Sequence, residues 1–396
     1  MTLQKNFFVI FLILVSFIFA ISKFYTFYLN YSDWQYADWL INYQAGFVRR
    51  GLIGEILFHI HQIFYIRLDI LIFFFVSSLY LLFSIFLFKS LRYLENSNID
   101  LLILFSPGFF LYPIMNSEVI GRKEILFLSI FSSLIFLEKK IRQNYILPLF
   151  LIIVAILSLS HSAFIFYAPF YLVLFILIKK NRNLNINSWE IFIISLSFLL
   201  LVFLIYISNG SQMHIEKICL SVREFVSNNC GLTDQISWLD SSIDNYINAK
   251  SSDDLLKRYF LIYGFSLIAV FLFISIKILN SKYTLKFAVY QKFHPFFVML
   301  ILCLSTIPTF IIGLDWGRYI YIAYSTVFFL LIYCIKNKVL EFREIFFYKK
   351  INFNNKLIIV FIFFYSFFWT FPFYDAKNFK ITLNKPIKII IQKINN

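Results

Sequence analysis

The fold is decided by stretches such as residues 189–208, which read WEIFIISLSFLLLVFLIYIS and contain a single charged side chain. A helix of about 20 apolar residues is long enough to cross the hydrocarbon core of a bilayer. Comparable runs recur along the 396-residue chain, which is 60% hydrophobic and 14% charged, against about 45–50% and about 25% in soluble domains. The sequence therefore excludes a water-soluble globule and predicts an all-α polytopic integral membrane protein.

Apolar runs of about 15 to 21 residues predict about eleven transmembrane helices within a single transmembrane domain, 1–396. The predicted spans are 7–25, 69–88, 99–115, 124–138, 145–160, 162–178, 189–208, 259–277, 294–313, 318–335 and 357–373.

The distribution of Lys and Arg between alternate connections predicts the orientation of the spans. With a cytoplasmic N-terminus, nineteen basic residues fall in cytoplasmic connections and seven in the short outer ones. Basic residues accumulate on the cytoplasmic side of membrane proteins. The formal charge of +15 therefore reflects the orientation of the spans in the membrane, and we expect no nucleic-acid partner.

The first outer segment, 26–68, is too polar to span a membrane. Beyond Gly51, one face of a predicted helix is apolar and another is polar, which is typical of a helix lying in the membrane interface. The apolar face contains Leu52, Ile53, Ile56, Leu57 and Ile60, and the polar face contains Glu55, His59 and Gln62.

Arg49 and Arg50 precede this helix and lie beside glycines. Guanidinium groups match phosphate oxygens, and the free amides at a helix N-terminus also attract anions. The pair predicts a phosphate or pyrophosphate site. The alternative is that both arginines reach toward lipid headgroups at the membrane boundary.

Asp33 and Asp38 lie among Trp34, Tyr36 and Trp39, directly after the first span. Carboxylates in such surroundings can act as general bases, and aromatic faces can accommodate sugar rings. The alternative is an interfacial aromatic belt that contains incidental carboxylates.

Three other outer connections also carry ionisable side chains at the ends of spans. These are Glu118, Arg122 and Lys123 between the third and fourth spans, His161 between the fifth and sixth, and Asp315 and Arg318 between the ninth and tenth. Asp315 and Arg318 could simply pair across one helical turn, and His161 could be an interfacial histidine. Because ionisable residues are costly at the membrane, their recurrence at one depth indicates a functional site.

Two further regions are predicted to face outward: a long polar loop, 209–258, and an amphipathic tail, 374–396. The loop contains Cys219 and Cys230, which an oxidising compartment would allow to form a disulfide. The sequence lacks the usual metal-ligand spacings and phosphate-binding loops, so no metal site is assigned.

The motif Asp38-Trp39, Asn42-Tyr43 and Gly46 to Leu52, together with Asp315-Trp316-Gly317-Arg318, resembles bacterial surface-polysaccharide membrane proteins. These are the O-antigen or capsule repeat-unit polymerases and the related GT-C glycosyltransferases. The resemblance implies a GT-C-like architecture in the bacterial inner membrane, with an active site on the periplasmic face. It also implies a donor and an acceptor linked to polyprenyl phosphate or pyrophosphate.

The resemblance assigns roles to the outward residues. Asp33 or Asp38 would activate the acceptor hydroxyl, and Arg49 and Arg50 would hold the leaving pyrophosphate. Further pyrophosphate contacts would come from Arg122, Lys123 and Arg318, and sugar-orienting contacts from Glu55, Glu118, His161 and Asp315. No cofactor is required, because these bases can neutralise pyrophosphate, although a divalent metal stays open. The implied partners are the lipid-linked glycans, membrane lipids and, in a polymerase, a chain-length regulator or other assembly proteins.

Three other functions stay open. A single-sugar GT-C transferase would share the same site. A transporter or flippase for a lipid-linked glycan would carry polar residues near the middle of its spans, often in repeated halves. Neither feature is evident in this sequence, which favours an interfacial site. If the protein were a structural or assembly subunit, Arg49 and Arg50 would have no evident function.

Overall fold

The computed structural model describes residues 3–31, 34–94, 98–226, 230–232, 234–240, 253–284, 294–342 and 355–372. Contacts group the chain into two units built from alternating segments. Unit 1 comprises Met1–Ser16, Leu87–Ser117 and Ala249–Asn396, and unit 2 comprises Phe17–Phe86 and Glu118–Asn248. The predicted tail, 374–396, lies outside the described residues.

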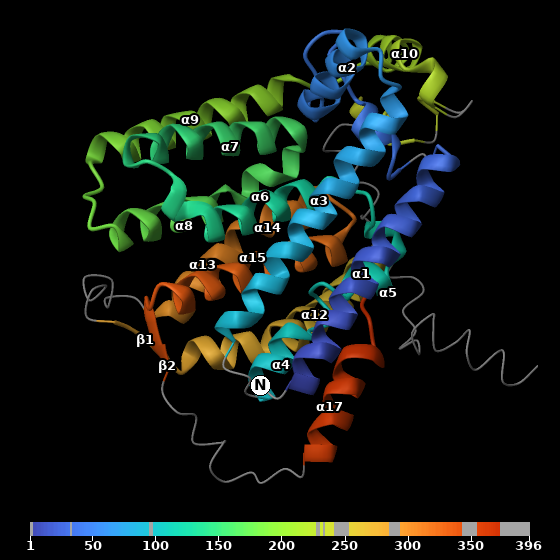
Figure 1. The fold of residues 1–396 in the computed structure, drawn as a ribbon. Coiled ribbons are helices and arrows are strands. Elements are labelled where there is room, and N and C mark those ends of the chain that lie inside the picture. The colour runs from blue at the N-terminus through green and yellow to red at the C-terminus, as the bar shows by residue number, and fades with distance from the viewer. Residues whose placement is uncertain are drawn as a thin grey trace, which may run out of the picture. The chain divides into compact units, whose positions relative to one another are not determined.

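Almost all regular structure in the described residues is helical (Figure 1). The α-helices are α1 (Leu3–Leu29), α2 (Leu52–Phe64), α3 (Leu68–Ser90), α4 (Asn98–Leu104), α5 (Tyr112–Met115), α6 (Glu124–Leu137), α7 (Ile146–Ser160), α8 (Ala168–Asn181), α9 (Ser188–Ile207), α10 (Gln212–Ser221), α12 (Asp253–Leu279), α13 (Pro295–Ser305), α14 (Ile307–Ile312), α15 (Trp316–Lys336) and α17 (Asn355–Phe367). The strands β1 (Ser281–Tyr283) and β2 (Leu340–Phe342) pair antiparallel.

Eight helical segments in the described part of the chain are long and apolar enough to cross a membrane. They are Val9–Leu29, Leu68–Tyr93, Gln143–Ser160, Ser162–Asn181, Ser188–Ile207, Tyr259–Leu279, Pro295–Ile312 and Trp316–Lys336. Each coincides with a span predicted from sequence. The prediction of an all-α polytopic membrane protein is confirmed at this level.

The other three predicted spans are not long helices in the described residues. Over 99–115 the chain forms α4, an irregular stretch and α5, and Pro107 and Gly108 lie in the break, where both residues disfavour helix. The fourth predicted span is α6, which has 14 residues and is about 21 Å long at 1.5 Å per residue. The last is α17, which has 13 residues. The count of eleven therefore stays a prediction.

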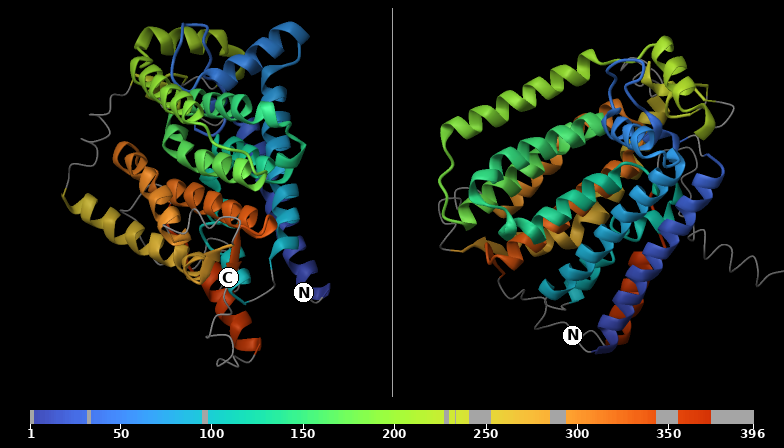
Figure 2. Two further views of the ribbon diagram at one scale, coloured as in Figure 1. Left: turned by 90° about the vertical axis from the view of Figure 1, so that its left-hand side faces the viewer. Right: turned by 45° about the horizontal axis from the view of Figure 1, so that its top comes forward.

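In unit 2, α7 lies alongside α8 and α9, and it also packs against α2 (Figures 1 and 2). The predicted helix beyond Gly51 is confirmed as α2, whose Ile53, Leu57 and Phe58 are buried while Ile56 is exposed. Gly54 of α2 abuts the backbone carbonyls of Trp39 and Ile41, so closely that no side chain fits there. This packing fixes α2 against the segment that carries Asp38.

In unit 1, α15 is the most buried of the eight apolar helical segments, with 89% of its apolar stretch buried inside the protein. It packs against α12 and α14, and α12 in turn packs against α4 (Figure 1). A buried ion pair joins Lys277 of α12 to Asp100 of α4. A buried charge needs a partner, so this pair fixes the relative register of the two helices.

Candidate functional site

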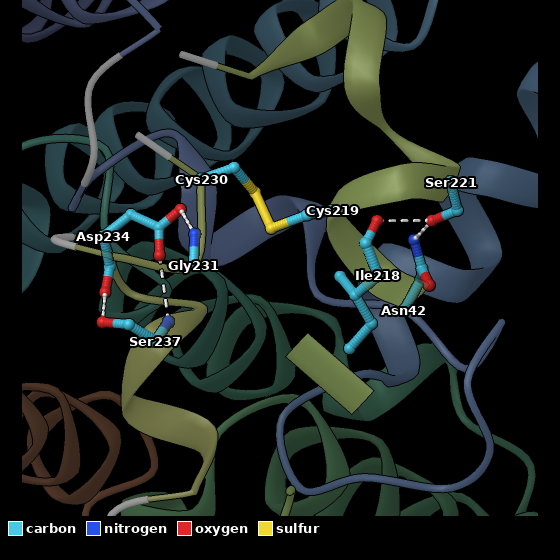
Figure 3. The surroundings of a disulfide bond; sticks show 8 residues. All are labelled: Asn42, Ile218, Cys219, Ser221, Cys230, Gly231, Asp234 and Ser237. Atoms are coloured by element: carbon cyan, nitrogen blue, oxygen red, sulfur yellow. Dashed lines mark hydrogen bonds between the residues drawn. A yellow bond between two sulfur atoms is a disulfide. The ribbon is translucent and has the colours of Figure 1, made fainter. Parts of the chain in front are cut away.

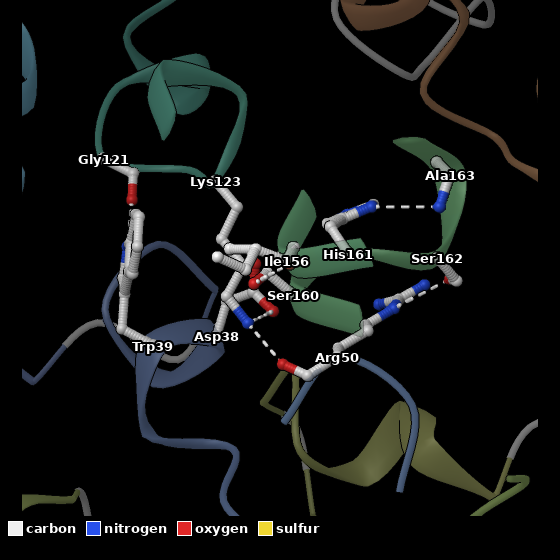
Figure 4. A network of polar contacts seen from close by, with 10 residues as sticks. All are labelled: Asp38, Trp39, Arg50, Gly121, Lys123, Ile156, Ser160, His161, Ser162 and Ala163. Carbon is white, nitrogen blue, oxygen red and sulfur yellow. Dashed lines mark hydrogen bonds and ion pairs between the residues drawn. The ribbon is translucent and has the colours of Figure 1, made fainter. Parts of the chain in front are cut away.

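Residues from four segments of unit 2 form a buried polar cluster, shown in Figure 4. Asp38 comes from a 3-10 helix, Ala37–Leu40; Arg50 precedes α2; Lys123 precedes α6; and His161 and Ser162 follow α7. We refer to Asp38, Arg50, Lys123, His161 and Ser162 as the polar cluster. Four of its members were predicted as site residues from sequence, and the structure brings them together in one unit.

Asp38 is held in place by its neighbour Trp39, which is fully buried. The indole Nε1 of Trp39 donates a hydrogen bond of 2.5 Å to the carbonyl of Gly121. The amide of Gly121 donates in turn to the hydroxyl of Tyr80, at 2.9 Å. Gly121 has a φ of +81° and lies against the ring of Phe24, which explains a glycine here. Trp39 thus ties the Asp38 segment to the turn that carries Lys123.

Lys123 is the centre of the polar cluster and is inaccessible to solvent. Its Nζ lies 3.4 Å from Oδ1 of Asp38 and donates a hydrogen bond of 2.9 Å to the carbonyl of Arg50. Burial lowers the pKa of Lys123, and the nearby charge of Asp38 opposes this effect. Such a desolvated ion pair is typical of functional sites, although structural pairs are also perturbed.

Arg50 adopts a left-handed backbone conformation with a φ of +71°, which is uncommon for a residue with a side chain. The bond from Lys123 to its carbonyl holds this conformation. The half-buried guanidinium donates from Nε to the hydroxyl of Ser162, at 3.5 Å. Arg50 therefore lies at the N-terminus of α2 as predicted, with its side chain directed toward the end of α7.

His161 is buried and ends α7. Its Nδ1 accepts a hydrogen bond of 3.2 Å from the amide of Ala163, which caps the 3-10 helix Ser162–Tyr167. With Nδ1 accepting, the proton of a neutral ring resides on Nε2. The contact gives His161 a structural role in addition to the predicted sugar-orienting role, which stays a prediction.

Arg49 lies apart from the polar cluster, because its side chain contacts a different segment. Its Nη2 donates to the carbonyls of Trp238 and Leu239, at 3.0 and 3.3 Å. Its amide donates to the carbonyl of Ser208, at 3.0 Å. Arg49 therefore anchors the long loop, and the two adjacent arginines have different surroundings.

The described residues of the long loop up to 240 (209–226, 230–232 and 234–240), here called the disulfide segment, fold onto residues 41–48. Cys219 and Cys230 form a disulfide bond (Figure 3). A small apolar core contains Ile41, Val48, Ile215, Ile218, Ile236 and Leu239. Asn42 donates to the hydroxyl of Ser221, at 3.0 Å (Figure 3). The disulfide segment thus covers residues 41–48; residues 227–229, 233 and 241–252 of the predicted loop are outside the described part of the chain.

Among the described residues, one group of three His, Cys, Asp or Glu side chains is close enough to share a metal ion: Cys219, Cys230 and Asp234. The two sulfur atoms are joined to each other. The carboxylate of Asp234 accepts hydrogen bonds from the amides of Gly231 and Ser237, at 3.0 and 2.9 Å (Figure 3). These contacts give Cys219, Cys230 and Asp234 a structural role within the loop.

Glu55 forms a second polar centre on α2. Its carboxylate accepts hydrogen bonds from the amide of Tyr43, at 2.7 Å, and from the side chain of Gln44, at 3.0 Å, and it pairs with His59 at 2.9 Å. Burial raises the pKa of Tyr43, and the charge of Glu55 adds to this effect. Glu55 therefore stabilises the turn after Ile41, and its predicted contact with sugar stays a prediction.

Arg122 lies above the ring of Trp34, with 6.0 Å between Cζ and the ring centroid. Its Nε donates to the carbonyl of Glu118, at 3.0 Å, and Gln35 donates to the same carbonyl, at 3.2 Å. The side chain of Glu118 is exposed. Arg122 and Glu118 therefore lie beside the segment of Asp38.

The remaining predicted site residues lie in unit 1 or outside the described residues. Asp315 and Arg318 belong to unit 1 and form an ion pair of 3.0 Å between Oδ2 and Nη2. This is the pairing that sequence reasoning left open. Asp33 lies outside the described residues.

Sequence reasoning missed several residues that support the site. Ser162 was passed over because single serines are common in apolar spans, and the aromatic positions of Tyr80 and Trp238 gave no signal among so many aromatic residues.

A second ion pair that was missed joins Arg67 and Asp69, at 2.8 Å, at the start of α3. The signal available in the sequence was an acid, Asp69, at the start of a predicted span; the structure shows its side chain to be buried. Burial raises the pKa of nearby Tyr36, with a further contribution from Asp69.

Comparison of the chain with protein-family models, curated proteins and solved structures finds no match.

Proposed function

We propose that this protein is a membrane glycosyltransferase that polymerises surface-polysaccharide repeat units from polyprenyl-(pyro)phosphate-linked sugars. The carrying observation is the ion pair of Asp38 with the solvent-inaccessible Lys123, whose ammonium group also donates to the backbone carbonyl of Arg50. Buried charges destabilise a fold unless they are well paired, and their retention at a span end is best explained by chemistry.

The proposed reaction uses Asp38 as the base. Oδ1 of Asp38 faces Lys123, so Oδ2 is the atom assigned to accept the proton of the acceptor hydroxyl. The acceptor oxygen then attacks the anomeric carbon of the donor, and the bond from that carbon to the pyrophosphate oxygen breaks. Arg50 at the N-terminus of α2 is positioned to hold the leaving pyrophosphate through its guanidinium and the helix dipole.

We place the site on the periplasmic face of the bacterial inner membrane, with a cytoplasmic N-terminus. The disulfide Cys219–Cys230 supports this placement, because disulfides persist in oxidising compartments. The excess of Lys and Arg in the alternate connections supports the same orientation. A GT-C-like arrangement of the spans is part of the proposal.

Two other functions remain as alternatives. A single-sugar GT-C transferase would use the same cluster. A lipid-linked glycan transporter would need polar groups within the spans to line a path. The polar cluster is instead assembled from residues at helix ends, which favours a transferase.

The test replaces Arg50 with Gln, because this change leaves the backbone carbonyl that binds Lys123 and keeps the pair with Asp38 intact. We expect the surface-glycan ladder to disappear from gels while the protein remains inserted and disulfide-bonded. The matched control is Arg142→Gln, which removes an exposed guanidinium and should leave the ladder unchanged. A normal ladder from Arg50→Gln would reject the catalytic assignment.

The surface glycan of a deletion strain separates the two transferase functions. A single capped repeat unit in place of the ladder supports a polymerase, because synthesis of the unit is then intact. A shortened or altered repeat unit supports a single-sugar transferase instead.

A further inference from the structure

We propose that Trp34 and Trp238 form a binding face for a pyranose ring of the glycan acceptor. The inference rests on the proposed function and adds a sugar subsite to it. The two indole rings lie together, with 5.7 Å between centroids and an interplanar angle of 59°. Both side chains are half-buried, so each ring keeps part of its surface accessible.

The exposure of this pair distinguishes it from the other tryptophans of unit 2. Trp39 is fully buried and serves packing. Trp189, on α9, is 66% exposed and stacks on Phe192 of its own helix, as expected for a ring that faces lipid. Trp34 and Trp238 come from segments about 200 residues apart in the sequence, and the fold brings them into contact.

A guanidinium lies against one ring of the pair. The guanidinium of Arg122 lies over Trp34. The backbone carbonyl of Glu118 accepts hydrogen bonds from Arg122 and Gln35, and the side chain of Glu118 is exposed. A pyranose presents apolar C–H groups on its faces and hydroxyls at its edge. Aromatic rings with a guanidinium beside them therefore match both parts of the sugar.

The disulfide segment holds Trp238 in place. The carbonyl of Trp238 accepts the hydrogen bond from Arg49, and its neighbour Leu239 lies in the core of the segment. Trp34 precedes Asp38 by four residues, so one ring of the sugar face belongs to the segment that carries the proposed base. Arg49 thereby acquires a role as a positioning residue for the sugar face.

The test measures binding of free oligosaccharides to the full-length protein in nanodiscs by saturation-transfer NMR. The probe is the mixture of short oligosaccharides released by mild acid from the surface polysaccharide of the source cells. We expect Trp34→Ala and Trp238→Ala to weaken binding by about tenfold or more, since loss of an aromatic contact near 1.4 kcal/mol is tenfold in affinity. Trp238→Phe should bind with intermediate affinity.

Trp189→Ala is the matched control and should bind as the wild type does. Formation of the Cys219–Cys230 disulfide, read from mobility on non-reducing gels, shows that the variants retain the disulfide segment. The proposal is overturned if Trp238→Ala binds the probe as tightly as the wild type, or if the wild type gives no transfer signal.

The glycan ladder of the Arg50→Gln variant tests the proposed function, and oligosaccharide binding by the tryptophan variants tests the sugar face, so the two proposals can fail independently. Tryptophan-dependent binding together with a normal Arg50→Gln ladder would reject the transferase and retain the sugar face. Loss of the ladder in Arg50→Gln together with unaltered binding by Trp238→Ala would do the reverse.

Discussion

At the scale of single residues, Lys123 is a fully buried cation whose stability in the fold depends on its pairing with Asp38. Replacing it with Met keeps the apolar stem but leaves Asp38 buried without its cation. We expect a loss of about 3–5 kcal/mol in the free energy of unfolding. Adding Asp38→Asn should restore much of this loss, because the double variant buries no charge. Thermal unfolding of the detergent-solubilised protein measures both effects.

Lys282→Met is a suitable comparison, because Lys282 pairs with Glu341 at 3.3 Å and both side chains are more than half exposed. An exposed pair contributes about 0–1 kcal/mol. Equal stability of the Lys123→Met and Lys282→Met variants would show that the Asp38–Lys123 pair is not buried as described.

The lowered pKa of Lys123 also predicts how stability depends on pH. The unfolded chain has the ordinary lysine value of 10.5, and the folded protein has a lower one. Between these two values the unfolded state binds more protons than the folded state, so this residue makes the free energy of unfolding rise with pH. The unfolding temperature of the wild type, relative to that of Lys123→Met, should therefore increase as the pH approaches 10.5. Parallel curves would contradict a lowered pKa.

The ionisable residues of the polar cluster were predictable because charges are scarce at the ends of spans, whereas Ser162 was not. What could not be predicted was the separation of Arg49 from Arg50. The left-handed backbone of Arg50 directs the two side chains to different partners. The partners of Arg49, the carbonyls of residues 238 and 239, are distant in sequence.

At the scale of elements, the contact of α2 with the 3-10 helix Ala37–Leu40 depends on Gly54. A methyl group at this position would overlap the carbonyl of Ile41, and neighbouring backbone cannot yield as a flexible side chain can. We expect Gly54→Ala to lower the free energy of unfolding by about 1–3 kcal/mol, as overpacking does, and to disturb the position of Asp38. Thermal unfolding and the glycan ladder measure the two effects.

Gly264→Ala is the control for this substitution. Gly264 lies within α12 and has open space at its Cβ position. Alanine is favoured over glycine in helices by about 1 kcal/mol, so this variant should be as stable as the wild type or more so. A stable Gly54→Ala variant with a normal ladder would argue against the close packing of α2.

Most long helices could be predicted because each needs only a continuous apolar run. The interruption between α4 and α5 also had a signal, the dipeptide Pro107-Gly108. The break at Thr306 between α13 and α14 was not predicted, although Pro308 follows closely. The shortness of α6 also had a local signal, because Arg122 and Lys123 precede the helix and Glu138, Lys139 and Lys140 follow it.

At the scale of the whole molecule, the proposed orientation makes a direct prediction about accessibility. A cysteine in place of Met213, an exposed residue of α10, should react with an impermeant maleimide in intact spheroplasts. A cysteine in place of the exposed Lys139, between α6 and α7, should react only after the membrane is permeabilised. The opposite labelling pattern would invert the proposed topology and place the disulfide segment in the cytoplasm.

The division into two units was beyond sequence reasoning. Hydropathy detects spans one at a time, whereas the units are defined by contacts between segments that are distant along the chain. Asp315 and Arg318 were grouped with Asp38 by their expected depth; they belong to unit 1, and the grouping stays a prediction.

The alternation of the two units along the chain has a consequence for biosynthesis. The segments of unit 2, including the whole polar cluster and the disulfide segment, have all been translated once the ribosome passes Asn248. Unit 1 contains the first residues of the chain but needs everything from Ala249 onward to be complete. The unit that carries the proposed chemistry can therefore assemble while the nascent chain is still tethered, and the unit that begins first is finished last.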